Sequence, residues 1–180
     1  MGQNIWFTSD LHFGHNRDFL YEPRGFNDIE THDRAIIENI NEIVKEDDTL
    51  YILGDLMLND NDYGMDCLNK INCRNIYIIL GNHDTSARVE LYSYLPNVKI
   101  LGYAAPFKHK KWNFMLSHYP MNTANLDDDR APYLKMWNLC GHSHTKEKID
   151  PITNSIHCEL DAWDNYPVSI EQIKEFIKKK

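Results

Sequence analysis

The chain has 180 residues, and we expect residues 1–180 to form a single domain with its own hydrophobic core. Its net charge of −8 argues against a protein that holds nucleic acid by bulk positive charge. No apolar run approaches the roughly 18 residues of a membrane span, and the start of the chain does not read as a leader, so we expect a cytoplasmic protein. The four cysteines lack the CxxC spacing of zinc sites, which predicts reduced thiols.

The first half of the chain alternates short apolar runs with longer amphipathic ones. Strands rich in Ile, Leu and Tyr are predicted at 4–8, 49–53 and 75–80. Between them, apolar residues at helical spacing predict helices at 29–46 and 62–71. This order of strands and helices indicates a parallel sheet that is covered by helices.

The second half has a different pattern, with strands that follow one another directly. The predicted elements are a helix at 86–95, strands at 98–107, 110–118, 135–142 and 155–162, and a closing helix at 169–179. A Lys-rich turn before the second of these strands indicates a hairpin, and 132–137 is expected to enter the core as a strand. The whole chain therefore predicts one α/β domain with a mixed sheet or a sandwich of two sheets.

Polar side chains follow the predicted strands, at the point where each strand ends. They are Asp10 and His12, then Asp55, then Asn82, His83 and Asp84, then His118, and finally His142 and His144. Because ligands of α/β sheets bind outside the carboxyl ends of the strands, we expect these side chains to meet in one crevice.

The local spacing of these residues suggests how the backbone presents them. Asp10 and His12 are separated by one residue, as are His142 and His144, so an extended backbone would point each pair to one side. At three strand ends a glycine directly precedes a candidate ligand, which is Asp55, Asn82 or His142. These glycines are Gly54, Gly81 and Gly141. We expect these glycines to supply backbone angles that other residues resist.

The residue types point to metal chemistry. Two carboxylates, one amide and four imidazoles are more ligands than one metal ion can use, whereas two ions that share a carboxylate can use them all. Mixed nitrogen and oxygen ligands favour Mn, Fe or Zn over Ca. Two such ions with Asp10, Asp55 and a bridging hydroxide would leave a local charge of about +1, which favours a phosphate substrate.

The motifs in this order resemble the calcineurin-like metallophosphoesterase superfamily. They are DxH at 10–12, GD at 54–55, GNHD at 81–84, SHYP at 117–120 and GHSH at 141–144. The closing DAWDNYPVSIEQI and the HFGH at 12–15 are similar to the small bacterial and phage members. The resemblance implies a four-layer αββα sandwich with mixed sheets and a dimetal site at the carboxyl ends of the strands.

The resemblance also implies roles for the single residues. Asp10, His12 and His144 would hold the first metal ion, Asn82, His118 and His142 the second, and Asp55 would bridge them. His83 would stand free of the metals and act on the substrate, and we assign it the role of general acid. We expect two divalent ions, with Mn²⁺ favoured and Fe, Zn or Ni as alternatives, and attack on the phosphate ester by a metal-bound hydroxide.

The substrate is less defined by the sequence. A phosphodiester or a small nucleotide-like phosphate is favoured over a phosphoprotein, because the GD motif continues with Leu56 and Met57 and lacks the acid and arginine of the protein phosphatases. Nucleic acid remains an alternative that the acidic charge disfavours, and a binding scaffold without catalysis is the rival class of function.

Other polar residues carry weaker expectations. His15 and Arg17 follow the first motif and are candidates for contact with the substrate phosphate. The arginines expected at the surface are Arg24, Arg88 and Arg130, and the histidines expected to be exposed or structural are His32, His109 and His157. The loops 18–28 and 122–132 are alternative walls of the substrate site.

Overall fold

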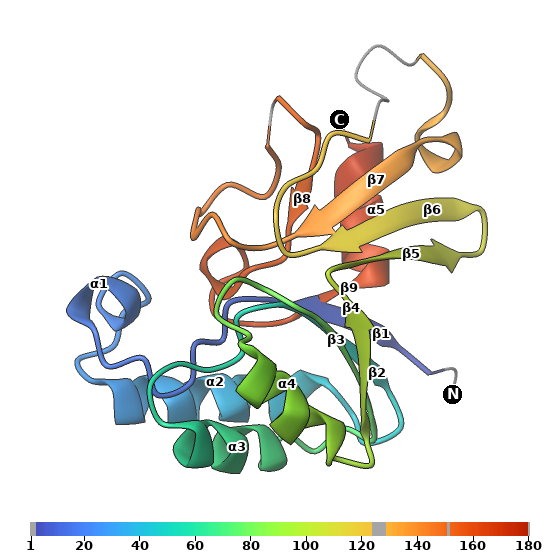
Figure 1. Ribbon diagram of the computed structural model, residues 1–180. Helices are drawn as coiled ribbons and strands as arrows, with labels where there is room; N and C mark the ends of the chain where they lie inside the picture. The colour runs from blue at the N-terminus through green and yellow to red at the C-terminus, as the bar shows by residue number, and fades with distance from the viewer. Residues whose placement is uncertain (1–2, 124–128, 151, 180) are drawn as a thin grey trace.

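The computed structural model describes residues 3–123, 129–150 and 152–179, and it contains two β-sheets (Figure 1). The larger sheet has the strand order β4-β3-β2-β1-β9, in which β1 to β4 run parallel and β9 pairs antiparallel with β1. Its strands are β1 (Ile5–Thr8), β2 (Thr49–Leu53), β3 (Asn75–Ile79), β4 (Val98–Gly102) and β9 (Val168–Ser169). The apolar runs are nearly continuous because the parallel strands are covered on both faces.

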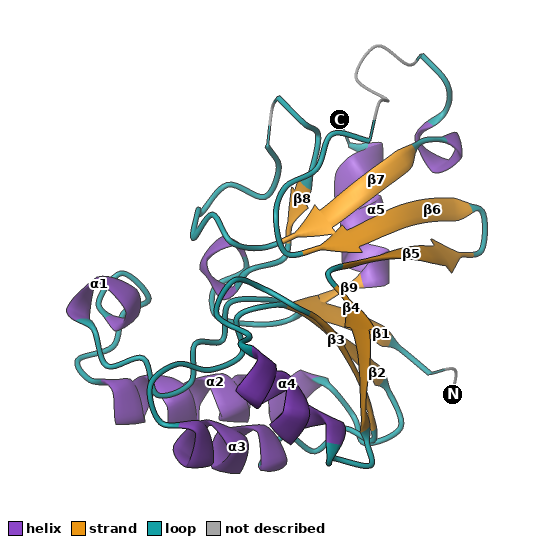
Figure 2. Ribbon diagram, in the orientation of Figure 1, coloured by secondary structure: helices purple, strands orange, loops and turns teal. Residues whose placement is uncertain are grey.

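Helices cover one face of the five-stranded sheet, as Figure 2 shows below the strands. They are α2 (Ile29–Ile43), α3 (Asn61–Asn69) and α4 (Ser86–Ser93). The carboxylates of Asp28 and Asp60 accept backbone N–H groups at the starts of α2 and α3, which satisfies donors that the helix itself leaves unpaired. Ile36, Ile40 and Tyr92 of these helices are fully buried in the first hydrophobic core.

The smaller sheet has the strand order β5-β6-β7-β8. Its strands are β5 (Ala104–His109), β6 (Trp112–Ser117), β7 (Met136–Cys140) and β8 (Ile156–His157). β5 and β6 form the predicted hairpin, and β6, β7 and β8 run parallel. The helix α5 (Ile170–Lys178) passes behind β6 and β7 in Figure 1. Phe114 of β6 and Ile173 of α5 share the second core with Phe7 of β1, so both sheets pack on one apolar interior.

These two mixed sheets with their helices confirm the predicted α/β fold class, although several predicted elements differ. The single strand predicted at 98–107 is wrong, because the chain turns at Gly102 (φ +92°) and leaves β4 of one sheet for β5 of the other. The strand predicted at 132–137 begins instead as the 3₁₀ turn η1 (Pro132–Leu134), and the one at 155–162 stops after β8, before the 3₁₀ turn η2 (Leu160–Ala162). The short helix α1 (Asp18–Tyr21) was not predicted.

The carboxyl ends of β1, β2 and β3 lie on the same side of the molecule as those of β6 and β7. The arrowheads of β6 and β7 point toward this side, at the left of Figure 1. The loops that leave both sheets therefore meet at one edge of the sandwich. In the described part of the chain, no helix is both long enough and apolar enough to cross a membrane.

Candidate metal centre

The loops at this edge bring together the seven side chains that the sequence predicts as metal ligands. Asp10 and His12 follow β1, Asp55 follows β2, Asn82 follows β3, His118 follows β6, and His142 and His144 follow β7. Four of these residues thus come from the larger sheet and three from the smaller. The site lies where the two sheets meet.

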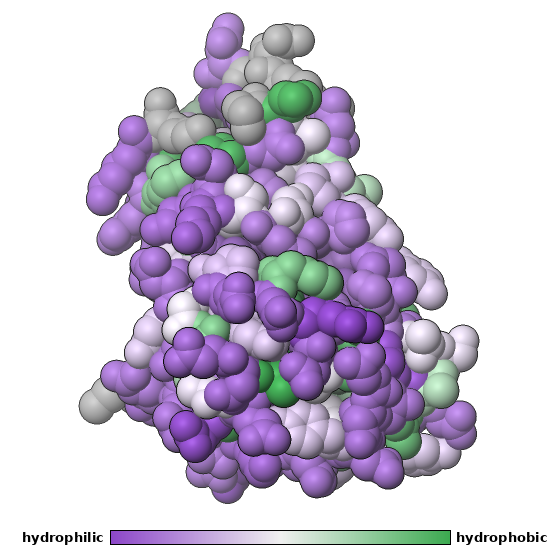
Figure 3. All heavy atoms as spheres, turned by 90° about the vertical axis from the view of Figure 1, so that its left-hand side faces the viewer, coloured by the Kyte–Doolittle hydropathy of each residue, from purple (hydrophilic) through white to green (hydrophobic). Residues whose placement is uncertain are grey.

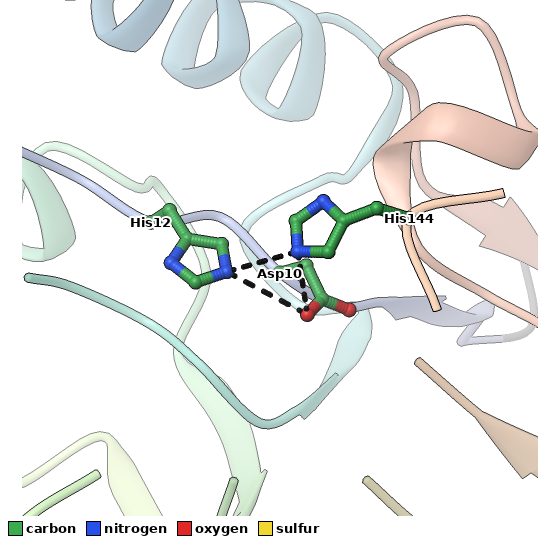
Figure 4. A group of neighbouring side chains, drawn as sticks. All are labelled: Asp10, His12 and His144. Carbon is green, nitrogen blue, oxygen red and sulfur yellow. Dashed lines mark hydrogen bonds and ion pairs between the residues drawn. The ribbon is translucent and has the colours of Figure 1, made fainter. Parts of the chain in front are cut away.

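The first cluster consists of Asp10, His12 and His144, whose ligand atoms all lie within 4.8 Å of one another. Nε2 of His12 is 3.2 Å from Nε2 of His144 and 3.7 Å from Oδ1 of Asp10. Nε2 of His144 is 3.5 Å from the same carboxylate oxygen. Figure 4 shows both imidazole rings turned toward the carboxylate, the arrangement expected of three ligands around one ion.

The second cluster consists of Asp55, Asn82, His118 and His142. Nε2 of His118 is 3.4 Å from Oδ2 of Asp55 and 3.1 Å from Oδ1 of Asn82. The ring of His142 lies 5.0 Å from that of His118, measured between centroids. Asp10, Asp55 and His118 also have ligand atoms within 4.8 Å of one another, so the two clusters adjoin.

The backbone at these residues is not extended, which corrects the expectation from their spacing. The residues with positive φ in the two clusters are Asp10 (59°), His12 (51°), Asp55 (56°), His142 (74°) and His144 (47°). Residues other than glycine rarely adopt this left-handed region, and each instance costs on the order of 1–3 kcal/mol. The surrounding hydrogen bonds hold this conformation, as when N–H of Asp10 donates to the carbonyl of Gly54.

Glycine is needed at the strand ends for two different reasons. Gly54 has φ +95°, so it supplies the unusual backbone angle that the sequence predicts. Gly81 and Gly141 do not have positive φ, and there the prediction is wrong. A Cβ on Gly81 would lie 2.2 Å from Oδ1 of Asp55, and one on Gly141 would lie 2.4 Å from Oδ2 of Asp10. These glycines leave room for the two carboxylates.

The electrostatics of the site keep its carboxylates ionised. Burial disfavours the charged form of Asp10, but the adjacent imidazole of His12 and the charges of His144 and His118 outweigh it and hold the Asp10 pKa well below its ordinary value. Burial likewise opposes protonation of His118, yet its hydrogen bond with Asp55 and the charge of Asp10 raise the His118 pKa to about 9. The proton on His118 thus compensates part of the negative charge of Asp10 and Asp55.

The donor set fits a pair of divalent metal ions. Among the residues that the structure describes, no group donates a hydrogen bond to Oδ1 of Asp10 or partners Nδ1 of His12, although both atoms are buried. A buried carboxylate oxygen without a partner is costly unless a cation contacts it. Burial, the largest influence, also lowers the His12 pKa, which favours the neutral imidazole that a metal requires.

His83 lies beside the clusters and is partly open to solvent. Its Nε2 is 3.9 Å from Oδ2 of Asp55, and its side chain is 40% exposed. The backbone N–H of His83 donates to Oδ1 of Asp55 at 2.9 Å, and Arg88 donates to its carbonyl. Arg88 is buried, so the expectation that it is a surface charge is wrong; it fixes the loop that carries His83.

Asp84 is a structural residue of the site whose role the sequence did not reveal. Its buried carboxylate accepts the backbone N–H groups of Asp55 at 2.9 Å and Gly81 at 2.8 Å, and the hydroxyl of Tyr92. One carboxylate therefore ties the loop after β2 to the loop after β3. The only sequence signal for this structural role was the position of Asp84 in the GNHD motif.

Arg24 and Asp161 form a second structural group that sequence reasoning missed. Arg24 was expected at the surface, but its side chain is 1% exposed and pairs with the carboxylate of Asp161 at 2.7 Å. The same carboxylate lies 3.2 Å from Nδ1 of His144. His32, also buried, contacts Arg24, which supports the structural role expected of it.

The rim of the site contains further imidazole and aromatic side chains. The ring of His15 is buried 5.3 Å from that of His12, and burial lowers the His15 pKa to about 4. Phe19 stacks edge-on against His15 and is 72% exposed, while Arg17 is exposed at the start of α1. Across the site, the ring of Tyr119 lies 4.5 Å from that of His142. Of the two loops expected to wall the site, residues 124–128 lie outside the described residues.

Known proteins match both the sequence and the fold. The family model of the calcineurin-like phosphoesterases matches residues 3–154. The uncharacterized protein MJ1445 of Methanocaldococcus jannaschii is 28% identical, with 98% of this chain and 93% of that protein covered. The Gene 66 protein of Mycobacterium phage L5 is also 28% identical, over 97% of this chain and 94% of its own length.

Two solved structures share the fold. A protein of unknown function from Aquifex aeolicus, AQ665, superposes with a TM-score of 0.72 at 21% identity, over 97% of this chain and all of its own. A novel archaeal phosphodiesterase superposes with a TM-score of 0.51 at 19% identity, over 89% of this chain and 87% of its own. The family match spans most of the chain and all the motifs at the metal centre, which confirms the resemblance drawn from the sequence. The chain belongs to the calcineurin-like phosphoesterase family and is a metal-dependent phosphohydrolase.

Proposed function

We propose that this protein hydrolyses a phosphodiester or a small nucleotide-like phosphate at a centre of two divalent ions. The residues of the first cluster would hold one ion, and Asn82, His118 and His142 the other. Asp55 would bridge them. The proposal includes one metallophosphoesterase domain over residues 1–180, since α5, beyond the family match, packs into the core shared by both sheets.

The position of Asp55 carries the proposal. Its Oδ2 lies 3.7 Å from Nε2 of His12 in the first cluster and 3.4 Å from Nε2 of His118 in the second. It is thus within reach of a ligand atom on each side, as a bridging carboxylate must be. The pKa of Asp55 is lowered, because the hydrogen bond and charge of His118 outweigh the effect of burial, so the bridge would be anionic.

Two bound divalent ions would supply a water of lowered pKa and would neutralise charge on the phosphoryl oxygens. The chain itself supplies the proton for the leaving group. His83 is the candidate donor, because its imidazole lies next to Asp55 and is partly exposed, while Asp55 and Arg88 hold its backbone. An imidazole beside the reacting centre is suited to donate a proton to an alkoxide leaving group.

The surface around the site supports a polar substrate of limited size. In Figure 3, the side of the molecule toward which the strand ends point is mostly hydrophilic, with hydrophobic residues scattered over it. His15, Phe19 and Tyr119 line the rim and could contact the groups attached to the phosphate; Arg17 stands next to His15. Nucleic acid stays a disfavoured alternative because of the net charge of −8.

The ligand types favour Mn²⁺, with Fe, Zn or Ni as alternatives, because imidazole nitrogens are combined with carboxylate and amide oxygens. A scaffold without catalysis is disfavoured, because the side chains of the two clusters lie close together and His83 lies beside them. The cytoplasmic location expected from the sequence stays a prediction.

The experiment is steady-state hydrolysis of bis-p-nitrophenyl phosphate and of p-nitrophenyl phosphate by protein stripped of metal. We expect Mn²⁺ to restore turnover and the diester to be the better substrate. Preference for the monoester would overturn the diester assignment and leave the dimetal centre standing. Failure to turn over either compound with two Mn²⁺ bound per chain would favour the scaffold.

A further inference from the structure

Arg24 and Asp161 form a buried ion pair directly behind the first cluster. Arg24 lies between α1 and α2, and Asp161 lies in η2. Nε of Arg24 donates to Oδ1 of Asp161 at 3.1 Å, and Nη2 donates to Oδ2 at 2.7 Å. A buried ion pair is weak evidence for stability, because the loss of hydration offsets much of the attraction. Its position next to a metal ligand suggests another reason for the pair.

Asp161 determines which nitrogen of His144 faces the cluster. A carboxylate accepts hydrogen bonds and does not donate them, so Asp161, 3.2 Å away, favours the proton of the neutral imidazole on Nδ1 of His144. Nη2 of Arg24 also lies 3.3 Å from this nitrogen, but its two protons are directed to Asp161 at 2.7 Å and to the carbonyl of Asp10 at 2.9 Å. The lone pair is then on Nε2, the atom that lies 3.5 Å from Asp10 and 3.2 Å from His12. Carboxylates that hold metal-bound histidines in this way orient the ring and strengthen it as a ligand.

Arg24 connects this carboxylate to a second ligand. Its Nη2 also donates to the backbone carbonyl of Asp10 at 2.9 Å, and Asp10 is held there in the left-handed conformation. One guanidinium therefore contacts the backbone of one ligand directly and the side chain of another through Asp161. A lysine could not replace it, because a single ammonium group cannot present the planar pair of donors.

The same network extends to the loop of the third ligand. Nη1 of Arg24 contacts Nε2 of His32 at 3.1 Å, and Nδ1 of His32 lies 2.7 Å from Oδ1 of Asp33. The other oxygen of Asp33 accepts the N–H of Gly14, in the loop that carries His12. All the residues of the first cluster are thus tied to one buried chain of side chains.

The second cluster is oriented differently. Nδ1 of His118 contacts the backbone carbonyl of Leu53 at 2.9 Å, so strand β2 itself fixes that ring. We therefore propose that Arg24 and Asp161 are positioning residues that prepare the first metal site and leave the second unaffected. This inference rests on the proposed two-metal function and adds a selective control of one ion.

The test counts Mn²⁺ ions bound to metal-free protein by isothermal titration calorimetry, in the wild type and in Asp161→Asn. The asparagine has nearly the same shape, but it must turn its NH₂ group toward either Arg24 or the protonated Nδ1 of His144. We expect one Mn²⁺ site of unchanged affinity and a second site weakened about 10–100-fold. Asp164→Asn, at an exposed position close in sequence, is the matched control and should bind both ions as the wild type does.

A double variant identifies the weakened site. Asn82→Ala removes a ligand of the second cluster, so Asp161→Asn combined with Asn82→Ala should leave no site of wild-type affinity. If both changes affect the same site, the double variant will retain one normal site and the inference is wrong. Equal weakening of both sites by Asp161→Asn alone would also overturn it.

Arg24→Lys provides a second variant if Asp161→Asn does not fold. It keeps the positive charge, and we expect it to weaken the same single site, with circular dichroism to confirm the fold. Normal binding of two ions by Arg24→Lys would contradict the role of the guanidinium.

If the wild type hydrolyses neither nitrophenyl ester but the variants still weaken one Mn²⁺ site selectively, this inference is supported and the proposed catalysis is rejected. A wild type that binds fewer than two ions would reject both.

Discussion

The two clusters of the metal centre are held by different means. The first is supported by side chains that meet from distant parts of the chain, with Arg24 paired to Asp161 behind His144. The second is supported by contacts to the backbone of neighbouring strands and loops: a carbonyl of β2 lies behind His118, and the carboxylate of Asp84 accepts two backbone N–H groups. Because strand β2 fixes the second site, substitutions at Arg24 or Asp161 can change the metal affinity of the first site alone. The two sites therefore need not bind metal equally.

The largest effect is expected from a change of Asp55, the residue proposed to bridge the two metal ions. Asp55→Asn removes the charge that would bridge the ions, and we expect turnover to fall about 1,000-fold together with loss of bound metal. Metal analysis of the purified variant, with Asp62→Asn on the exposed start of α3 as control, measures this. Full occupancy by two ions would refute the bridge.

His83 belongs to neither cluster, so its loss should separate metal binding from catalysis. We expect His83→Ala to bind two ions and to lose turnover by about 100–10,000-fold on esters with an alkyl leaving group. The loss should be smaller for p-nitrophenyl esters, whose leaving group needs no proton. A variant that is equally slow on all leaving groups would not support a role as general acid.

Asp84→Asn tests the backbone support of the second cluster. Its NH₂ group would face N–H donors in a buried position, and unsatisfied buried groups cost about 1–3 kcal/mol. We expect the free energy of unfolding of the metal-free protein to fall by about that amount, measured by urea denaturation. An unchanged midpoint would show that the loops after β2 and β3 are held by other contacts.

The raised pKa of His118 predicts how the metal-free protein responds to alkaline pH. The folded state keeps a proton on His118 up to about pH 9, whereas the unfolded chain releases it near 6.5. The stabilising effect is therefore complete below pH 6.5 and is progressively lost as the pH rises to about 9. Thermal unfolding at pH 6 and pH 9 measures it, and His118→Gln should reduce the difference. An equal difference in the variant would assign the effect to other groups.

The smallest effect is expected at the rim. Tyr119 packs on His142, and its hydroxyl lies 3.4 Å from Oδ1 of Asn82, a long contact for a hydrogen bond. We expect Tyr119→Phe to change kcat by less than about threefold and to leave metal binding intact, because the ring is kept. A loss of one bound ion in that variant would show that the second cluster depends on the Tyr119 hydroxyl as well as on Asp84.

The sequence was sufficient for the residues that lie in local motifs. The pairs 10 and 12, and 142 and 144, follow apolar strands, and their residue types alone indicate metal ligands. The left-handed backbone at these positions could not be predicted, because it depends on hydrogen bonds such as that from His12 to Asp55. Spacing alone suggested an extended chain.

Arg24 and Asp161 could not be found from the sequence because 137 positions separate them. Nothing in the local sequence distinguishes a buried arginine from one at the surface; only the fold brings its partner near. The division of 98–107 between two sheets was missed for a related reason. The residues of both parts favour strands, and only a single turn at Gly102 separates them.

The placement of the ligands on loops from both sheets has a mechanical consequence. Asp10 and Asp55 follow strands of the larger sheet, while His118 and His144 follow strands of the smaller one. Bound ions would link the loops of the two sheets reversibly. Hydrogen exchange should then slow in both sheets near the metal centre when Mn²⁺ is added, and chelation should let the two sheets separate more often.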